Sequence, residues 1–504
     1  MVLGIDLGTS NTVAATVSRD GAAVVIPDAG NKDLQSTPTK VLIDKNRAFA
    51  GQFAESLFEL YPQKKLLSFF KRFFGTGMPV YTDEMNNPWF SEGLAALILR
   101  KVKHDAAVFI PDGFEQCVIT VPAHYNDVQR KSVFEAARLA ELDLSAIIDE
   151  PVAAALNYGS GVPAKSEELT LVYDFGGGTF DLTLITQNEN HLHVIAKDGI
   201  DKLGGKEFDE IIASEVRSGY ETAIGRSFPE DPLNQNRLQK LSEELKIEIS
   251  KEEVAYVSKW ILAGKEAFEC VVPAHEYRTK AEDLIRKTGA AVTRCLRSMG
   301  LQLQDIQNVI LIGGTSNSHQ VYQYWKELTK NTNTRVVYHQ PLNGVAKGAA
   351  LYAQSLATGS GNLFRSIELK SVSTYHIGLR KPGETAIDLM IHRNSPLPVS
   401  AQRRFTVTPT GLPLFKMEVV QYWDEGEMQV LGCIELDASF PVIEDFVLEL
   451  QLENKANGTI GLKLRDAANG KEIKFTFSRN RSQYQYNYQQ QKNLLDNIII
   501  NNSI

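Results

Sequence analysis

The sequence predicts an α/β region over roughly its first 355 residues, followed by a separate all-β domain. Over residues 1–355 strand-like and helix-like segments alternate, which is typical of α/β folds. From about residue 373 to about 480, short runs with the two-residue period of a half-buried strand follow one another. Between these two textures lies LATGSGNLFRSIELKS, whose Gly/Ser part is typical of a linker.

The α/β region begins with two consecutive predicted strands, VLGIDLGTS and NTVAATV. Apolar residues at helical spacing predict helices over residues 90–109 and 127–142. The runs QCVITVPA and ELTLVYDF are short, apolar and rich in β-branched residues, which predicts buried strands.

In the second region, strands are predicted at RFTVTP, FKMEVVQYW, MQVLGCIEL, FVLELQL, TIGLKL and EIKFTF. The turn signals Asn457-Gly458 and Asn469-Gly470 favour two-residue hairpin loops. The last residues, 481–504, are rich in Gln and Asn. Their composition fits either a short helix or a disordered segment prone to β-association.

Charge and cysteine content limit the class of protein. The net charge of −8 is spread over interspersed acidic and basic residues, which argues against nucleic acid as the main partner. The four cysteines are far apart, which argues against a disulfide framework or zinc site and for a reducing compartment. We expect no signal peptide and no membrane span, because no suitable apolar run is present, and therefore a cytoplasmic protein.

The stretch LVYDFGGGTFDLTL places three consecutive glycines between Asp174 and Asp181. Glycine is depleted in strands, so this run indicates either a tight turn with positive φ or a close approach to the backbone. Residues 5–9, IDLGT, repeat the apolar-Asp-apolar-Gly pattern of residues 173–177, YDFGG. This echo predicts two lobes of related architecture that each offer a hairpin to a shared cleft.

These glycine turns favour the binding of nucleotide phosphate. A third glycine signal, NVILIGGTSNS (308–318), joins a predicted strand to a helix-like segment, where N–H groups can face an anion. Thr9, Ser10 and Thr179 add hydroxyl donors, and Asp6 and Asp174 are placed to hold hydrated Mg²⁺. The P-loop pattern GxxxxGK[ST] is absent. Any one of the turns alone would be an ordinary hairpin, but three in this order favour a nucleotide cleft.

Eight motifs in a fixed order carry a resemblance to a known family: GIDLGTSNT, FFKRFFG, VITVPAHYNDVQR, IIDEPVAAALNYG, YDFGGGTFD, KLGGKEFD, EELKIEIS and LIGGT. The chain resembles the DnaK-type, seventy-kilodalton heat-shock chaperone family over its whole α/β region. Through RNSPLPV and NGKEIKFTF the β region also resembles that family's peptide-binding β-sandwich. The resemblance implies an actin-like ATPase domain (1–358), an interdomain linker (359–372), a β-sandwich substrate-binding domain (373–480) and a Gln/Asn-rich tail (481–504) in place of the helical lid.

The resemblance also implies roles for single residues. Catalytic roles fall on Lys71, Glu150, Asp174, Thr179 and Asp181, with water attacking the γ-phosphate of ATP in line. Asp6 and Asp174 hold Mg²⁺ through water. Nucleotide-binding roles fall on Gly8, Thr9, Ser10, Asn11, Gly176, Gly177, Gly178, Gly204, Gly205, Glu243, Lys246, Ser250, Gly313 and Gly314.

Pro122 and Arg130 are the family's relay between nucleotide state and the neighbouring domain. Read without the family, three of these motifs have plainer interpretations. Lys71 and Arg72 would be a solvated basic pair, EELKIEIS a charged helical turn, and VPAHYNDVQR a strand, a loop and a capped helix. The implied ligands are ATP or ADP with Mg²⁺ and extended apolar polypeptide. J-domain co-chaperones and nucleotide exchange factors are the family's other partners.

The chain departs from the family pattern at several places. Asn317 stands where the GGxxR motif has its adenine-stacking arginine, and Leu342 replaces an aspartate, so we expect nucleotide affinity to fall by on the order of 1 kcal/mol. The linker reads IELKS, with Glu368, Lys370 and Ser371 at positions that couple the domains in the family. Ala146 replaces an arginine important for J-domain partners. The lid is missing, so bound peptide should leave faster.

Two rival functions remain at this point. A metabolite kinase on the same fold would need a general base on the substrate side, and the β domain and absent sugar-kinase motifs argue against it. A non-catalytic scaffold that holds nucleotide and one dedicated partner is favoured by the altered linker and missing lid. The presence of Lys71, Glu150 and Thr179 favours an active ATPase instead. The residues of the peptide groove stay unassigned.

Overall fold

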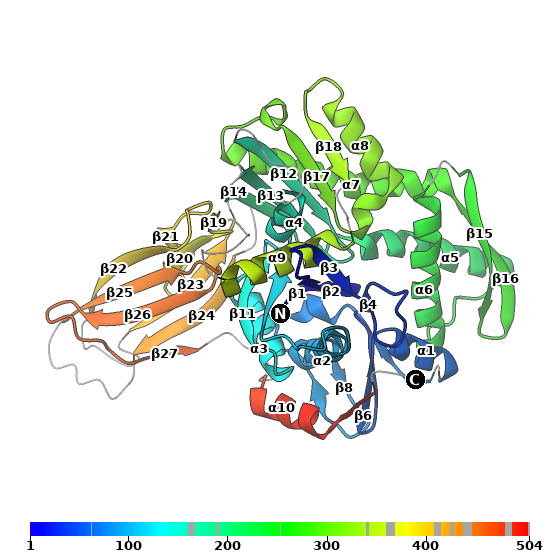
Figure 1. Cartoon of the computed structure of the whole chain (residues 1–504), viewed down its shortest axis with the longest axis horizontal. Helices are drawn as coiled ribbons and strands as arrows, with labels where there is room; N and C mark the ends of the chain where they lie inside the picture. The colour runs from blue at the N-terminus through cyan, green and yellow to red at the C-terminus, as the bar shows by residue number, and fades with distance from the viewer. Residues whose placement is uncertain are drawn as a thin grey trace.

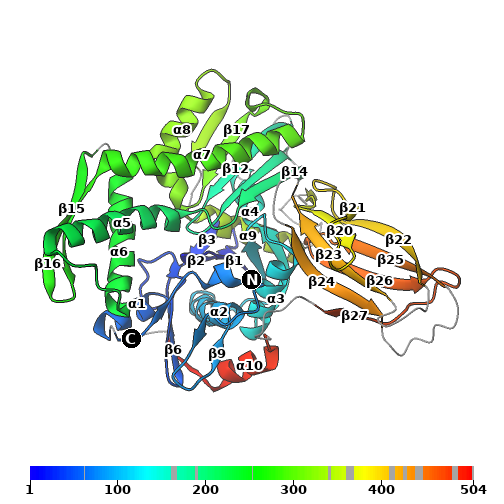
Figure 2. The ribbon, with the colours of Figure 1, turned by 180° about the vertical axis from the view of Figure 1, so that it is seen from behind.

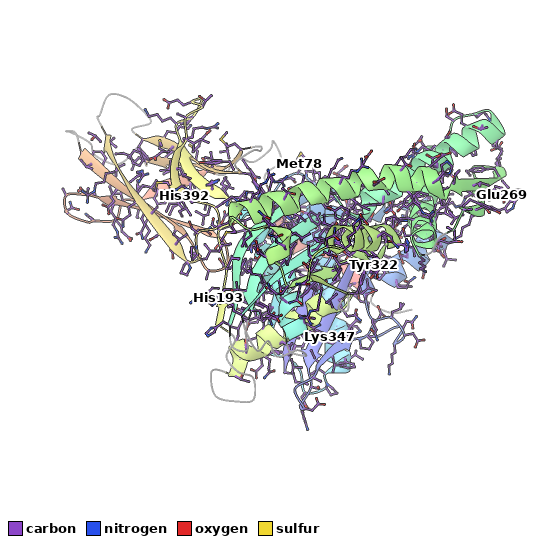
Figure 3. All side chains as sticks on the ribbon, turned by 90° about the horizontal axis from the view of Figure 1, so that it is seen from above. Met78, His193, Glu269, Tyr322, Lys347 and His392 are labelled. Atoms are coloured by element: carbon purple, nitrogen blue, oxygen red, sulfur yellow. The ribbon has the colours of Figure 1, made fainter. Side chains whose placement is uncertain are left out.

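The structure is a computed structural model that describes residues 1–61, 63–159, 167–187, 191–251, 254–338, 342–358, 368–407, 415–423, 428–436, 446–478 and 486–501. It consists of an α/β body with an all-β domain attached at one side (Figures 1 and 2). Seen from above, His392 of the β domain and Glu269 of the outermost hairpin of the body lie on opposite sides of the molecule (Figure 3). None of the helices in the described ranges is both long and apolar enough to cross a membrane.

The body contains two central sheets with the same strand order. The first sheet has the order β11 (Leu144–Asp149), β10 (Gln116–Val121), β1 (Val2–Leu7), β2 (Asn11–Val17) and β3 (Ala23–Ile26), with β4 (Thr37–Pro38) beside β2. The second has the order β18 (Arg335–Tyr338), β17 (Asn308–Ile312), β12 (Glu168–Phe175), β13 (Phe180–Gln187), β14 (His191–Ile200) and β19 (Glu368–Lys370).

Strand directions match as well as strand order. In each lobe the first three strands run parallel and the next two antiparallel. The hairpins β1–β2 and β12–β13 therefore occupy equivalent places in the two sheets. These hairpins carry IDLGT and YDFGG, so the two related lobes predicted from that echo are present.

Helices α4 (Glu150–Gly159) and α9 (Gly344–Thr358) lie between the two sheets, where one apolar cluster joins residues of both lobes. Close packing there depends on glycine. A methyl group on Gly348 would overlap the backbone of Ala153. The outer face of the first sheet is covered by α2 (Ser91–Phe109) and α3 (Asp127–Leu139), close to the predicted ranges. The second is covered by α7 (Ala274–Ser298) and α8 (His319–Thr329).

Smaller elements complete each lobe. The second lobe carries α5 (Gly205–Ile224), α6 (Pro232–Ile249) and the hairpin β15 (Tyr256–Ala263)–β16 (Glu266–Pro273), with the short turns η2 (Leu303–Asp305) and η3 (Gly314–Asn317). The first lobe carries α1 (Gln52–Leu60), η1 (Phe70–Phe73), β5 (Val41–Asp44), β6 (Arg47–Ala50), β7 (Leu66–Leu67), β8 (Tyr81–Thr82) and β9 (Pro88–Trp89).

The β domain is two sheets packed face to face around a shared apolar core. One has the order β21 (Asp388–Ile391), β20 (His376–Arg380), β23 (Lys416–Tyr422), β24 (Gln429–Leu436) and β27 (Phe475–Ser478). The other has the order β22 (Val399–Val407), β25 (Phe446–Asn454) and β26 (Ile460–Asp466). Six of these strands overlap the predicted runs, whereas β20 and β21 were not predicted.

The prediction of two-residue hairpin loops was wrong for both Asn-Gly turns. The N–H of Lys455 donates to the carbonyl of Thr459 at 2.9 Å, which leaves the three-residue loop 456–458. After β26, the N–H of Asp466 donates to the carbonyl of Lys471 at 2.9 Å, which leaves a four-residue loop. In both loops only the glycine is left-handed, with φ of 75° and 71°. Longer loops need one such residue, whereas the two-residue type I′ loop needs two.

Beyond the β domain the chain returns to the first lobe. It forms α10 (Tyr488–Asn497) and β28 (Ile499–Asn501), which adds to the edge of β6 in a sheet of order β28-β6-β5-β7. Of the two alternatives for the tail, the short helix is confirmed by α10, and residues 499–501 pair within the chain as β28 instead of belonging to a disordered segment. Residues 481–485 and 502–504 lie outside the described part.

Candidate functional site

A cavity of about 520 Å³ lies between the two lobes. Most of the predicted site residues line it, including Asp6, Gly8, Thr9, Ser10, Asn11, Lys71, Glu150, Asp174, Gly176, Gly177, Thr179, Gly205, Glu243, Lys246, Ser250, Gly313 and Gly314. Segments up to about 300 residues apart in the sequence therefore converge on one site.

The glycine hairpins touch each other at the base of this cavity. A methyl group on Gly177 would overlap the Ser10 hydroxyl, and one on Gly178 would lie 2.7 Å from a methyl carbon of Thr9. None of the glycines 176–178 has a left-handed φ. The glycine run is therefore explained by the close approach of the opposite hairpin rather than by positive φ. Gly313, with φ 84°, does use the left-handed region.

Lys71 forms a buried ion pair at one side of the cavity. It lies on η1 with its side chain 2% exposed, and its Nζ donates to Oε1 of Glu150 at 2.9 Å. This excludes the interpretation of Lys71 as a solvated basic residue. Glu150 begins α4, and burial together with the nearby carboxylates of Asp6 and Asp181 raises its pKa to about 7, although Lys71 acts in the opposite direction.

Two further carboxylates face the same space. Burial raises the pKa of Asp6, which also accepts a hydrogen bond from the Thr120 hydroxyl at 2.9 Å. Burial, reinforced by Glu150, Asp181 and Asp6, raises the pKa of Asp174 well above its ordinary value. Several carboxylates thus share one lysine, and such an excess of oxygen ligands suits a hydrated divalent cation. In the described ranges no three His, Cys, Asp or Glu side chains are grouped to chelate a metal directly.

The opposite end of the cavity is formed by α6 of the second lobe. Nζ of Lys246 lies 2.8 Å from Oδ1 of Asp209, whose pKa burial raises to about 6. The Ser250 and Tyr277 hydroxyls lie 3.3 Å apart. Asp209 and Tyr277 were not predicted from the sequence. Asp209 is the last residue of KLGGKEFD, one helical turn after its glycines, so that motif contained the signal.

Three side chains of mixed polarity also line the cavity near α6. Asn317 and Leu342 are the residues that depart from the family pattern, and Ile247, within EELKIEIS, is a third. None of these three side chains carries a charge, so they offer apolar and amide groups to a base bound against them.

Three predicted site residues lie just outside the cavity. Gly204 packs against the glycine hairpin, where a Cβ would lie 2.5 Å from the backbone nitrogen of Gly178. The carbonyl of Gly178 accepts a hydrogen bond from Arg72 of the first lobe at 2.7 Å. Arg72 also pairs with Glu207 of α5 at 3.0 Å, so it links the two lobes. Asp181 turns away from the cavity toward His124.

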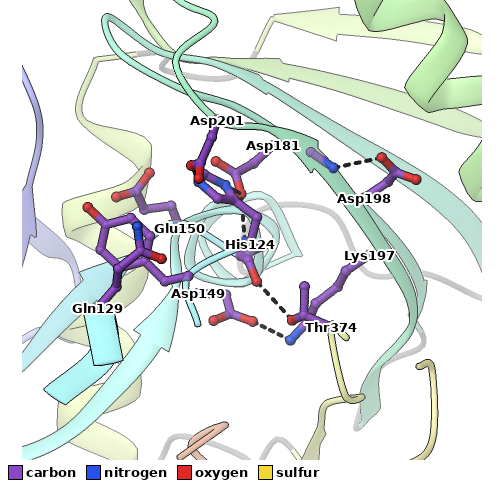
Figure 4. Close-up of polar contacts among 12 residues, drawn as sticks. His124, Gln129, Asp149, Glu150, Asp181, Lys197, Asp198, Asp201 and Thr374 are labelled. Atoms are coloured by element: carbon purple, nitrogen blue, oxygen red, sulfur yellow. Dashed lines mark hydrogen bonds and ion pairs between the residues drawn. The ribbon is translucent and has the colours of Figure 1, made fainter. Parts of the chain in front are cut away.

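His124 joins two carboxylates beneath the cavity (Figure 4). Its backbone N–H and its ring Nδ1 both donate to Oδ1 of Asp181, at 3.0 and 2.8 Å, and its Nε2 pairs with Asp201. Burial alone would lower the pKa of His124, but Asp181 and Asp201 outweigh it and raise that pKa well above its ordinary value. Sequence reasoning missed His124, although it lies within VPAHYNDVQR.

The predicted relay segment contacts the β domain. Nη2 of Arg130 donates to Oδ1 of Asp149 at 2.8 Å, and Nη1 donates to the carbonyl of Asn457 in the β25–β26 loop at 3.3 Å. Pro122, directly after β10, is buried, and its carbonyl accepts a hydrogen bond from the N–H of Tyr125 at 3.1 Å. Asp149, the partner of Arg130, directly precedes Glu150, which lines the cavity. Arg130 therefore joins the cavity to the β domain over a short distance in the structure.

Asp149 also reaches the linker. Its Oδ2 lies 2.6 Å from Nζ of Lys197 (Figure 4). Nζ of Lys197 also donates to the Ser371 hydroxyl at 2.8 Å. Burial would raise the pKa of Asp149, but Arg130 and Lys197 outweigh it and lower that pKa. This carboxylate therefore stays charged in the interior.

The described end of the linker docks on the second lobe through its backbone. β19 pairs in parallel with β14, and Leu369 packs against the apolar cluster between the lobes. Backbone pairing does not depend on side-chain type, so the unusual linker sequence is compatible with docking. The rest of the predicted linker, 359–367, lies outside the described residues.

Comparison with known proteins gives one consistent result. A family model described as Hsp70 protein matches residues 78–491. The chaperone proteins DnaK of Thermotoga petrophila and Thermotoga maritima are 31% identical to this chain over 484 residues, which cover 94% of the chain and 79% of the relative. The DnaK of Thermosipho africanus shows the same identity over 486 residues.

Proposed function

The chain belongs to the Hsp70 protein family, and on that premise we propose that it is an ATP-dependent molecular chaperone of the DnaK type. It binds ATP with Mg²⁺ between the lobes of an actin-like domain and hydrolyses it slowly. It binds extended apolar polypeptide segments in the β domain.

The buried pair of Lys71 and Glu150 carries this proposal. Burying two charges is costly, and the pair stabilises a fold little, so a functional reason for it is favoured. The pair faces the same cavity as the glycine hairpins, whose N–H groups suit phosphate. A pKa of about 7 lets Glu150 exchange a proton near neutral pH.

In the proposed reaction, water attacks the γ-phosphorus of ATP while the bond to the leaving β-phosphate oxygen breaks, giving ADP and phosphate. Glu150 orients the water and accepts its proton. Lys71 offsets the negative charge that develops on the phosphoryl oxygens, and Thr179 donates its hydroxyl there. Asp6 and Asp174 would hold hydrated Mg²⁺ through water, and the ion would supply positive charge next to the phosphates.

A nucleotide-holding scaffold without catalysis is the second candidate, and membership of a chaperone family argues against it. The uncharged Asn317 and Leu342 in the cavity wall bear on the strength of ATP binding and do not favour this alternative. A metabolite kinase is less supported, because phosphorylation of a small metabolite gives the β domain no role.

One residue bears on whether a J-domain co-chaperone binds this chain. Ala146, half-buried on β11, packs against the cluster between the lobes and offers no cation to a J-domain co-chaperone. Such a partner, or an exchange factor, would need contacts specific to this chain. We propose a cytoplasmic location, with which the four free cysteines agree.

Steady-state ATP hydrolysis by Lys71→Ala tests the proposal. We expect kcat to fall by on the order of 100-fold, because the lysine acts on charge that develops in the transition state. Lys64→Ala is the matched control. It removes a lysine of the same lobe that pairs with Asp44 outside the cavity, and it should leave kcat unchanged. Full turnover by Lys71→Ala, or ATP binding by the wild type without turnover, would contradict the ATPase proposal.

A further inference from the structure

The segment Tyr486–Asn501 leaves the β domain and lies on the first lobe. In Figures 1 and 2, α10 is at the lower edge of that lobe beside β6, apart from the strands of the β domain. We call this segment the C-terminal strap. It does not cover the β domain, and its contacts are with the ATPase body.

The strap is held by a buried polar contact. Gln491 of α10 is fully buried. Its Nε2 donates to the carbonyl of Pro88 at 2.7 Å, and its Oε1 accepts the N–H of Phe90 at 3.2 Å. This N–H is at the N-cap of α2 and has no partner within the helix. The side chain of Gln491 therefore satisfies a donor of the first lobe.

Apolar and cationic contacts surround this polar contact. Leu495 is 1% exposed and belongs to the core of the first lobe. Nη1 of Arg100 on α2 donates to the carbonyl of Leu495 at 2.7 Å. The guanidinium of Arg138 on α3 lies 3.8 Å from the centre of the Tyr488 ring, which is the geometry of a cation–π contact.

Gly93 of α2 leaves room for the side chain of Gln491 in the strap. This glycine lies in the first turn of α2, and a methyl group there would overlap Oε1 of Gln491. Glycine within a helix is less stable than alanine, so helix formation gives no reason for glycine at this position. The close approach of Gln491 does give one.

The end of the strap completes a sheet. β28 pairs in parallel with β6, and the N–H of Ile499 donates to the carbonyl of Asn46 at 2.8 Å. An edge strand exposes unpaired N–H and C=O groups, and β28 covers those of β6. Ile500 packs against the core of the first lobe.

These contacts limit how far the β domain can move. It ends at Ser478, and the strap begins at Tyr486. Eight chain steps span at most about 29 Å even when fully extended. At its other end the β domain is tied to the second lobe through β19.

We propose that the C-terminal strap is an intramolecular tether that keeps the β domain beside the first lobe, even when its contacts with Arg130 and the docked linker are broken. The α/β body thus binds residues 486–501 of its own chain. The tether does not depend on ATP hydrolysis, so it can fail or stand separately from the proposed function.

Hydrogen exchange on the full chain tests whether the strap is bound. Gly93→Ala should raise the rate of amide exchange in α10 and β6 about tenfold or more through local opening. In α2 itself the substitution should stabilise the helix, because alanine has a higher helix propensity than glycine. Gln490→Ala changes the exposed neighbour of Gln491 and is the matched control, with no rise expected. In a Gln491→Ala background, Gly93→Ala should have no further effect, because the overlapping side chain is gone.

Spin-label distances test whether the bound strap restrains the β domain. Labels would be placed at the exposed positions Asp112 in the first lobe and Lys474 in the β domain, in a Cys433→Ser background. With Mg-ADP and with Arg130→Ala, which removes the contact with Asn457, the full chain should give a narrow distribution, and a chain ending at residue 485 a broad one. Equal distributions, unprotected α10 amides in the full chain, or a strap bound to a second copy would each overturn the proposal.

Discussion

At the scale of single residues, the cavity concentrates acidic groups in a place where burial disfavours their charged form. Asp6, Glu150 and Asp174 all have raised pKa values, with burial as the largest cause. Lys71 is the only cation that ion-pairs with one of them among the described contacts. The protein without ligands is therefore strained electrostatically at this site, which is typical of groups shaped for binding or catalysis.

Asp174→Asn should stabilise the ligand-free protein in a pH-dependent way. The folded chain retains a proton on Asp174 that the unfolded chain releases above its ordinary pKa of 3.8. Folding stability therefore falls as pH rises from about 4 toward the raised pKa. Asparagine has no proton to lose, so Tm at pH 8 should rise by roughly 1–3 °C, with little change near pH 4.5.

Asp181→Asn is the matched comparison, because Asp181 lies directly opposite Asp174 in the hairpin. Asp181 is the partner of buried His124, so its loss leaves a buried cation short of a carboxylate and should lower Tm. Equal shifts for the two variants, or a shift for Asp174→Asn that is the same at both pH values, would contradict this account of the cavity.

Asn317→Arg should strengthen nucleotide binding. Asn317 lines the cavity at a position where a guanidinium could stack on a base. Such stacking is worth about 1 kcal/mol, which is roughly a fivefold gain in ADP affinity by calorimetry. Asn331→Arg adds the same charge on the exposed turn after α8 and should leave affinity unchanged. No gain from Asn317→Arg would mean that the base is bound elsewhere.

At the scale of elements, the segment from the end of β10 into α3 joins the cavity to the β domain. The N–H of Ile460 at the start of β26 donates to Asp127 at 2.8 Å, and Asn126 donates to Gln429 at 2.6 Å. The Thr374 hydroxyl donates to the carbonyl of Ala123 at 3.0 Å. Contacts from three parts of the β domain thus converge on one loop and one helix end.

Arg130→Ala should uncouple the two domains without removing nucleotide. The variant loses contacts with Asp149 and Asn457 together, whereas the cavity lining is unchanged. We expect ATP affinity to stay within about twofold, while ATP no longer changes the position of the β domain, measured with the same spin labels. Arg286→Ala removes an exposed arginine of α7 and is the control. A normal response of Arg130→Ala to ATP would exclude the relay.

Patterns within one element were predictable, and pairings between elements were not. The alternation of strands and helices, the repeated hairpin and the glycine run followed from local spacing. The loops after β25 and β26 were predicted too short, because one left-handed glycine serves several loop lengths. His124 and Asp209 were missed because each acquires its role from partners far away in the chain. The docking of Gln491 against Gly93 depends on residues almost 400 positions apart.

At the scale of the whole molecule, two separate attachments hold the β domain to the body. One is the linker strand β19 on the second lobe, and the other is the C-terminal strap on the first. Relative rotation of the lobes would therefore act on both ends of the β domain.

The dissociation rate of a fluorescent apolar peptide from the full chain tests the central claim most directly. It would be measured with Mg-ATP, with Mg-ADP and without nucleotide, for the wild type and for Lys71→Ala. The account predicts that peptide is released several-fold faster with ATP than with ADP. If ATP binding alone drives release, Lys71→Ala should show the same difference between ATP and ADP without hydrolysing ATP. Release that is indifferent to nucleotide, with ATP still hydrolysed, would contradict coupling and favour a dedicated partner.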